Sequence, residues 1–156
     1  MEIRKATKAD IGGLAKLLFE VQKVHSDVRP DLFIAGARKY TDEELEMMLL
    51  DDSKPIFVAD VDGAVGGYAF CVVSAPCSHT LQPIKTLYID DLCVDEGIRG
   101  HHIGSELYRF VVDYAKSIGC YNVTLNVWAD NKNALAFYER IGLKIQKIGM
   151  EKILND

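Results

Sequence analysis

The chain has 156 residues and a mass of 17.4 kDa, close to the commonest size of one compact domain, so we expect a single domain over residues 1–156. Hydrophobic residues make up 49% and charged residues 26%, which excludes collagen-like, low-complexity and disordered chains. The 18 Lys and Arg residues against 23 Asp and Glu residues give a formal charge of -5, so we expect neither nucleic acid nor a membrane as a partner.

The chain begins with a strand and two helices. Residues 2–5 predict a short strand, and apolar residues at helical spacing predict an amphipathic helix over residues 11–21. After an irregular crossing, Thr41 and Glu44 form a capping-box pattern, which predicts a second helix to about Leu50.

A group of three strands follows. Residues 56–61 and 65–73 predict a hairpin, because Asp62 and Gly63 between them tolerate the positive φ angles of a tight turn. Residues 86–94 predict the third strand, which is apolar except for two consecutive aspartates.

Helices and strands alternate in the last third. We expect a helix over residues 103–118, a strand over 123–128, a helix capped by Asp130 or Asn131, and one or two closing strands in 143–154. Passages from strand to helix to strand favour parallel pairing, whereas the hairpin is antiparallel. The order predicts a mixed α/β (α+β) fold, with a central twisted mixed sheet and helices on both faces.

The turn from Arg99 to Ser105 predicts a local anion site. It leads from a strand into a helix, whose first N–H groups lack partners and whose N-terminus carries about half a positive charge. Gly100 and Gly104 allow close approach of the backbone, and Arg99 adds a cation. An ordinary turn with a glycine hinge is the alternative. The P-loop and Rossmann patterns do not fit, since the lysine of one and the glycine spacing of the other are missing.

This turn resembles the acetyl-CoA-binding motif of the GNAT N-acetyltransferase superfamily, Gln/Arg-x-x-Gly-x-Gly/Ala. Arg99, Ile103 and Gly104 match the motif, while His102 stands where the family most often has glycine. Residues 131–143 are similar to a second family signature, Asn-x-x-Ala-x-x-Phe-Tyr-x-x-x-Gly-Phe, with leucine as the last residue. Both motifs fall on the expected elements, so the resemblance implies a GNAT-like acyl-CoA N-acyltransferase fold.

The resemblance also implies where acetyl-CoA binds. Family members hold it where two neighbouring parallel strands splay apart, here residues 92–94 and 123–127. The residues placed at the cofactor in this way are Leu92, Cys93, Val94, Arg99, Gly100, His101, His102, Ile103, Gly104, Ser105, Asn131, Asn133, Phe137 and Arg140. The two asparagines are equally explained as helix caps, and Arg140 as a solvated cation.

Two catalytic residues follow from the same resemblance. Tyr138 is expected to act as general acid for the departing thiolate. An alkyl ammonium with a pKa of about 10.4 must lose a proton before it attacks the thioester, and Asp90 is the candidate base, directly or through water. Asp91 is expected to point to the opposite strand face by alternation, and a salt bridge or a cap remains an alternative role for either acid.

The sequence therefore predicts an N-acetyltransferase that moves the acetyl group of acetyl-CoA to a primary amine by direct attack. The acidic balance favours a small cationic amine, and His25, Arg29, Asp31 and Phe33 are candidates for its recognition. A protein or peptide N-acetyltransferase, acting on an N-terminus or a lysine, is the first alternative. A non-catalytic acyl-CoA-binding module and an unrelated nucleotide-binding protein are the others. The family also implies a homodimer.

The N-terminal residues bear on the cellular compartment, and the cysteines bear on redox state and metal binding. The first 20 residues contain Glu2, Asp10 and Glu20 and lack a continuous apolar core, which argues against a secretory signal peptide. The four cysteines form no C-x-x-C pair and have no close His partner, so we expect reduced thiols and no metal. A cytoplasmic protein is predicted.

Overall fold

The computed structural model describes residues 1–154, which form two compact units, residues 1–126 and 127–154. The single domain expected over residues 1–156 stays a prediction. None of the described helices is long and apolar enough to cross a membrane.

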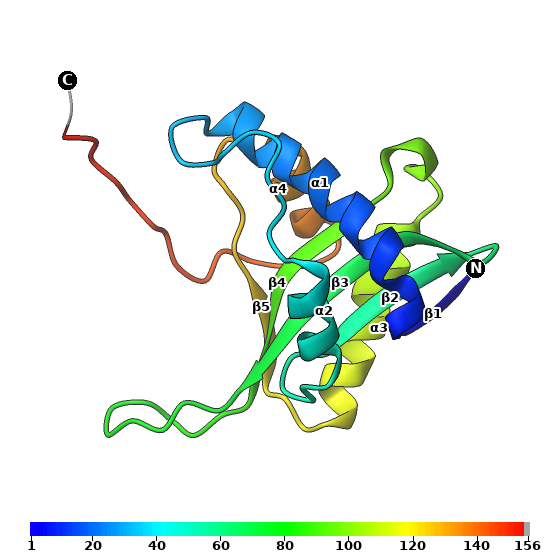
Figure 1. Cartoon of the computed structure of the whole chain (residues 1–156). Coiled ribbons are helices and arrows are strands. Elements are labelled where there is room, and N and C mark those ends of the chain that lie inside the picture. Colours follow the sequence, from blue (N-terminus) through cyan, green and yellow to red (C-terminus); the bar gives the residue numbers. More distant parts are fainter. Residues whose placement is uncertain (155–156) are drawn as a thin grey trace. The chain divides into compact units, whose positions relative to one another are not determined.

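The first unit is built on a five-stranded sheet with the spatial order β1-β2-β3-β4-β5 (Figure 1). Neighbouring strands are antiparallel except β4 and β5, which are parallel. Its elements are β1 (Glu2–Lys5), a 3-10 helix (Lys8–Asp10), α1 (Ile11–Val28), α2 (Asp42–Leu49), β2 (Ile56–Val61), β3 (Ala64–Ser74), β4 (Thr86–Val94), a 3-10 helix (Glu96–Ile98), α3 (Ile103–Ser117) and β5 (Asn122–Leu125). The mixed sheet predicted from the element order is confirmed.

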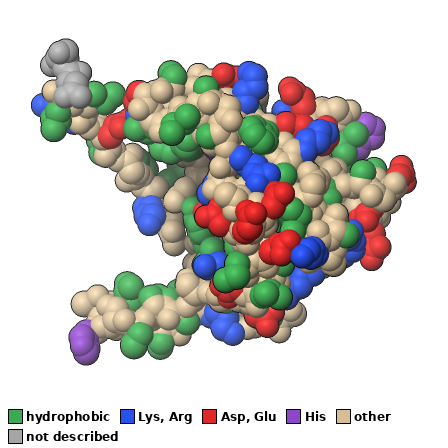
Figure 2. Space-filling view, viewed as in Figure 1, with side chains coloured by type: hydrophobic (Ala, Val, Ile, Leu, Met, Phe, Trp, Pro, Cys, Tyr) green, Lys and Arg blue, Asp and Glu red, His purple; other side chains and the backbone are tan. Residues whose placement is uncertain are grey.

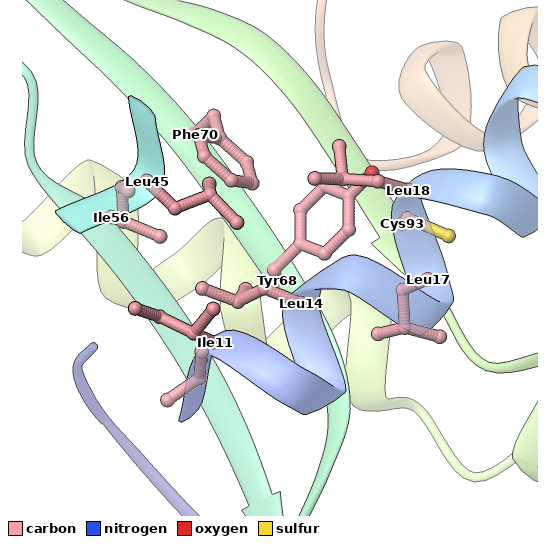
Figure 3. Close-up of a cluster of buried hydrophobic side chains, with 10 residues drawn as sticks. Ile11, Leu14, Leu17, Leu18, Leu45, Ile56, Tyr68, Phe70 and Cys93 are labelled. Atoms are coloured by element: carbon pink, nitrogen blue, oxygen red, sulfur yellow. The ribbon is translucent and has the colours of Figure 1, made fainter. Parts of the chain in front are cut away.

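One face of this sheet is covered by α1 and α2. The apolar positions of α1 recur every three or four residues and point at the sheet, as Figure 3 shows for Ile11, Leu14, Leu17 and Leu18. Leu45 of α2 joins the same buried cluster. Burying each such side chain contributes about 1.5–3 kcal/mol, which fixes α1 against β2, β3 and β4.

The other face is covered by α3. Its buried positions are four residues apart and meet the sheet side chains that point away from α1. The cluster consists of Phe57, Ala59, Ala69, Cys71, Leu87, Ile89, Ile103, Leu107, Val111 and Ala115. Helices on both faces, as predicted, leave the edges and the connections of the sheet as the places for a site.

Local signals in the sequence are confirmed where they concern turns and caps. Asp62 and Gly63 have φ angles of 53° and 84°, the left-handed conformations that the tight hairpin requires. At α2 the Thr41 Oγ accepts from the Glu44 N–H at 3.2 Å, and Glu44 accepts from the Thr41 N–H at 2.8 Å. The capping box therefore starts α2 where it was predicted to start.

A buried ion pair ties β1 to the start of α1. Arg4 donates to both carboxylate oxygens of Asp10, at 2.8 and 2.9 Å, and to Asp60 at 2.8 Å. The backbone and hydroxyl of Thr7 also donate to Asp10, whose side chain is 7% exposed. These hydrogen bonds lower the pKa of Asp10 to about 2, and the bond from Arg4 has the largest effect.

We expect Asp10→Asn to destabilise the protein by about 2 kcal/mol at neutral pH, because the carboxylate is favoured in the folded state relative to the unfolded one. A depressed pKa contributes stability that is present above the unfolded value of about 3.9 and is lost as the pH falls through the folded value. Urea unfolding at pH 7 and near pH 2 measures the difference. Asp52→Asn is the control, since the Asp52 side chain is 96% exposed. An equal loss at both pH values would contradict the prediction.

The second unit contains α4 (Lys132–Arg140), with Asn131 as its N-cap. The prediction of one or two closing strands in residues 143–154 is wrong, since the described chain has no strand after Leu125. Apolar residues do occur there, among them Ile145, Ile148 and Met150, but all three are exposed. A strand is defined by backbone pairing, which a run of apolar residues does not supply.

Candidate active site

A bulge in β4 places two acidic residues side by side. Phe70 of β3 pairs with Asp91, and the next residue of β3, Cys71, pairs with Ile89, so Asp90 is an extra residue on β4. Asp90 and Asp91 then contact tyrosines that both belong to the core on the α1 side. The expectation that Asp90 and Asp91 point to opposite faces of the strand is wrong, because an inserted residue shifts the alternation of the side chains.

Asp90 is held by two side chains from the connection between α1 and α2. The ammonium of Lys39 lies 2.7 Å from Asp90 Oδ2, and the Tyr40 hydroxyl donates to the same oxygen at 3.1 Å. Lys39 Nζ also lies 5.4 Å from the centroid of the Tyr40 ring. Burial lowers the pKa of Lys39, but the hydrogen bond to Asp90 and its charge outweigh this and raise it. Asp90 thus already binds an ammonium group.

Asp91 is half-buried and accepts a hydrogen bond of 2.9 Å from the fully buried Tyr68 hydroxyl. Burial raises the pKa of Asp91, although the bond from Tyr68 and the charges of Lys39 and His25 act in the opposite direction. When the Asp91 carboxyl is ionised, its burial therefore lowers the stability of the folded protein.

We therefore expect Asp91→Asn to be more stable than the natural protein at neutral pH. A folded pKa above the unfolded value means that stability is lost as the pH rises through this range, and an amide has no such loss. The difference should vanish below about pH 3.9, where the unfolded carboxyl is protonated too. Thermal unfolding between pH 3 and 8 measures it, and a variant less stable than the natural protein at pH 7 would refute it.

The strands β4 and β5 separate directly before the bulge. Their parallel pairing runs from Thr86 with Asn122 to Ile89 with Leu125. Beyond that point residues 92–94 pair only with β3 in the described chain. The strand predicted over residues 123–128 is therefore shorter, because β4 bends at the bulge and its pairing with β5 ends there. Residues 92–94, which the family resemblance assigns to the cofactor, thus have one edge without a strand partner in the described chain.

The connection from β4 to α3 combines a cation with an uncapped helix. Arg99 is exposed, and its Nε donates to Val94 O at 3.2 Å, which places the turn beside the open edge of β4. Gly100 has a φ angle of 89°. The His101 ring lies 3.1 Å from Ile98 O through Nδ1.

His102 is the N-cap of α3 and has the left-handed angles φ 62° and ψ 9°. It thus adopts the conformation that glycine adopts readily, at a cost of about 1–2 kcal/mol for other residues. Within residues 1–154 its side chain makes no capping hydrogen bond. The N–H groups at the start of α3, from Ile103 to Ser105, therefore point outward without a side-chain cap, and the Ile103 side chain is in the core.

These features fit the phosphate groups of acetyl-CoA. A 15-residue helix presents its N-terminus, and an arginine stands next to it. Figure 2 shows acidic and basic side chains intermixed over the face it displays, in line with an anion site that is local. The donor set of this turn matches a polyanion.

The remaining predicted residues lie on α4 of the second unit. Asn131 Oδ1 accepts from the Ala134 N–H at 3.1 Å and so caps the helix, as one interpretation predicted. The rings of Phe137 and Tyr138 meet edge to face at 5.1 Å, and the Arg140 guanidinium lies 5.9 Å from the Phe137 ring centroid. Asn133 is in the first turn of α4.

The cysteine on the open strand is not prepared for nucleophilic attack. Burial raises the pKa of Cys93 to about 12, so its thiol is protonated at neutral pH. Within residues 1–154 no group of three or more His, Cys, Asp or Glu side chains is arranged to hold a metal ion. Direct transfer to the acceptor fits this strand better than a covalent intermediate on Cys93.

The segment after α1 contains both expected and unexpected residues. His25 stacks on Phe33 with ring centroids 5.1 Å apart, and Arg29 forms an ion pair with Asp31 at 2.7 Å. Asp90 itself is contacted by Lys39 and Tyr40 of the same connection. Sequence reasoning missed these two residues and Tyr68. Only Tyr68, a polar-tipped residue in an apolar strand, gave a signal.

Comparison with known proteins identifies related acetyltransferases. The model of the Acetyltransferase (GNAT) family matches residues 21–143. An uncharacterized N-acetyltransferase of Methanocaldococcus jannaschii is 26% identical over 148 residues, 94% of this chain and 62% of the relative. The thialysine N-epsilon-acetyltransferase of Bos taurus is 26% identical over 147 residues, 90% of this chain and 82% of that protein.

The fold also has a solved counterpart. The crystal structure of a mutant protein from Bacillus halodurans is 31% identical, covers 99% of this chain and all of its own, and has a TM-score of 0.93. The chain spans less than two thirds of the length of the archaeal relative. The family model covers well over half of the chain, and the predicted fold class is confirmed. The chain belongs to the Acetyltransferase (GNAT) family.

Proposed function

We propose that the protein transfers the acetyl group of acetyl-CoA to the primary amine of a small cationic acceptor. The observation that carries the proposal is the open edge of β4, with the uncapped N-terminus of α3 next along the chain and a bulged pair of carboxylates directly before it. Acetyl-CoA requires backbone hydrogen bonds and an anion site, and a cationic acceptor requires a cation site.

Acetyl-CoA supplies the activated acyl group. The backbone groups of Leu92, Cys93 and Val94 on the edge that does not face β3 would pair with its amide-bearing arm, in the manner of an added strand, beside the Arg99 side chain that contacts Val94 O. Arg99 and the turn from Gly100 to Ser105 would hold its pyrophosphate. By resemblance to the family, Asn131, Asn133, Phe137 and Arg140 of the second unit would also contact the cofactor.

Asp90 is the proposed base. It holds the ammonium of Lys39 at 2.7 Å, so its carboxylate is accessible to an ammonium group. In the transfer, Asp90 takes a proton from the acceptor, the amine nitrogen bonds to the acetyl carbon, and the carbon–sulfur bond breaks. Tyr138 is proposed to give its proton to the departing thiolate, and the second proton that the nitrogen loses on becoming an amide restores the phenol.

The acceptor class is supported by charge and by one relative. The two adjacent carboxylates favour a cation, and the name of the Bos taurus relative gives an epsilon amine as its acceptor. The cytoplasmic location and the homodimer belong to the same proposal, and they come from the sequence and from the family.

The test is release of free thiol from acetyl-CoA across polyamines, amino acids, aminoglycosides and peptides with free N-termini. The affinity for CoA is measured on the same sample by calorimetry. Amine-dependent release with the small amines supports the proposal, and release with peptides alone moves the function to protein acetylation. Cofactor binding without release under any acceptor favours a binding module, and absence of cofactor binding refutes the proposal.

A further inference from the structure

The ammonium of Lys39 occupies a position suited to a substrate. It lies on a carboxylate, 2.7 Å from Asp90, and near the face of an aromatic ring, 5.4 Å from the centroid of Tyr40. A carboxylate combined with an aromatic face is a common arrangement for binding ammonium groups. Lys39 therefore shows how a cation is held at the proposed acceptor site.

Charge balance at this site depends on Lys39. Asp90 and Asp91 are adjacent on one face, and Lys39 neutralises one of the two charges when both are ionised. The other cations of the connection are engaged locally, Arg29 with Asp31 and Arg38 with Asp42, each at 2.7–2.8 Å. When both carboxylates are ionised, the pair thus keeps one negative charge that no ion pair neutralises among the described residues, and the positive charge of His25 acts on Asp91 from α1.

The same side chain also borders a space for the rest of a small molecule. Lys39 lines an open hollow of about 230 Å³, together with the apolar side chains of Leu32, Phe33, Ile34 and Ala37. An amine with a short apolar body would meet these side chains while its ammonium approaches the carboxylates. The polar residues that line the hollow besides Lys39 are Gln22 and Arg38, so a second ammonium there would meet another cation and no carboxylate of the lining.

On the basis of the proposed function, we propose that Lys39 determines acceptor specificity: it balances Asp90, so that the site selects amines with one positive charge over amines with two. Removing this side chain leaves two carboxylates and room for a second cation. The Lys39 side chain is 41% exposed, so its truncation should not disturb the core.

The experiment compares hexylamine with 1,6-diaminohexane in the natural protein, Lys39→Met, Lys39→Arg and Lys5→Met. Lys5→Met is the matched control, because Lys5 forms a surface ion pair with Asp52 at 2.9 Å, on the far edge strand of the sheet. The measured quantity is the ratio of kcat/KM for the diamine to that for the monoamine. The diamine has two amines that can react and the monoamine has one, but this factor is the same in every variant and cancels when the ratios are compared.

We expect Lys39→Met to raise this ratio about tenfold, the effect of one unit charge a few ångströms away in a partly screened site. Lys39→Arg keeps the charge and should keep the ratio within about twofold, as should Lys5→Met. An unchanged ratio in Lys39→Met, or an equal rise in Lys5→Met, would overturn the inference.

A binding measurement separates this inference from the proposed function. The dissociation constants of the two amines are measured by calorimetry on the protein without acetyl-CoA. If no amine leads to thiol release from acetyl-CoA, the proposed function fails. A tenfold change in the ratio of the two dissociation constants in Lys39→Met would still uphold the charge selection. If the natural protein turns over and neither ratio changes, only the inference fails.

Discussion

Replacing Tyr138 with phenylalanine should lower kcat about 10²- to 10⁴-fold and leave the affinity for CoA within about twofold, the range that a general acid contributes. The departing thiolate then takes its proton from water instead of a positioned phenol. The ring itself is kept, so the edge-to-face contact with Phe137 at 5.1 Å is preserved. Kinetics of thiol release and calorimetry with CoA give the two numbers.

The matched control is Tyr121→Phe, since Tyr121 is 75% exposed and lies outside the proposed site. It should leave both quantities unchanged. A Tyr138→Phe protein with full turnover would remove Tyr138 from the reaction, and loss of CoA affinity in parallel with kcat would give it a binding role. A binding module, by contrast, has no turnover for this substitution to reduce.

Local signals in the sequence located most of the first unit. The bounds of β1, β2 and β4 are those expected, because strand alternation and the Asp62–Gly63 turn act over a few residues. The helix α1 runs seven residues beyond its predicted end at Val21, to Val28. The turn into α3, where we propose the anion site, was also readable, since glycines, an arginine and a helix start are adjacent in the chain.

The features that were missed depend on contacts between distant parts of the chain. Whether Asp90 is bulged is decided by its register with β3, which composition and spacing do not reveal. Lys39 and Tyr40 reach Asp90 across 50 or more residues of sequence. The closing strands were mispredicted for a related reason, since their apolar residues needed a pairing partner that the described chain does not give them.

The bulge leads to the second prediction, on Asp90. We expect Asp90→Asn to lower kcat/KM about 10²- to 10³-fold at pH 7, because an acceptor ammonium then loses its proton to water alone. Only the neutral fraction of an amine with a pKa of about 10.4 can react in this variant. Its rate should therefore rise about tenfold per pH unit and approach that of the natural protein near pH 10.

The acceptor's own basicity gives an independent check. An amine whose pKa lies below 7 is already neutral, so Asp90→Asn should cost it little if Asp90 acts as a base. Asp52→Asn is again the control, because it removes a carboxylate from an ion pair with a lysine at a similar distance, 2.9 Å. Equal losses for strongly and weakly basic amines at every pH would mean that Asp90 only binds the acceptor. Asp91, next to it on the same face, would then be the remaining carboxylate able to take the proton.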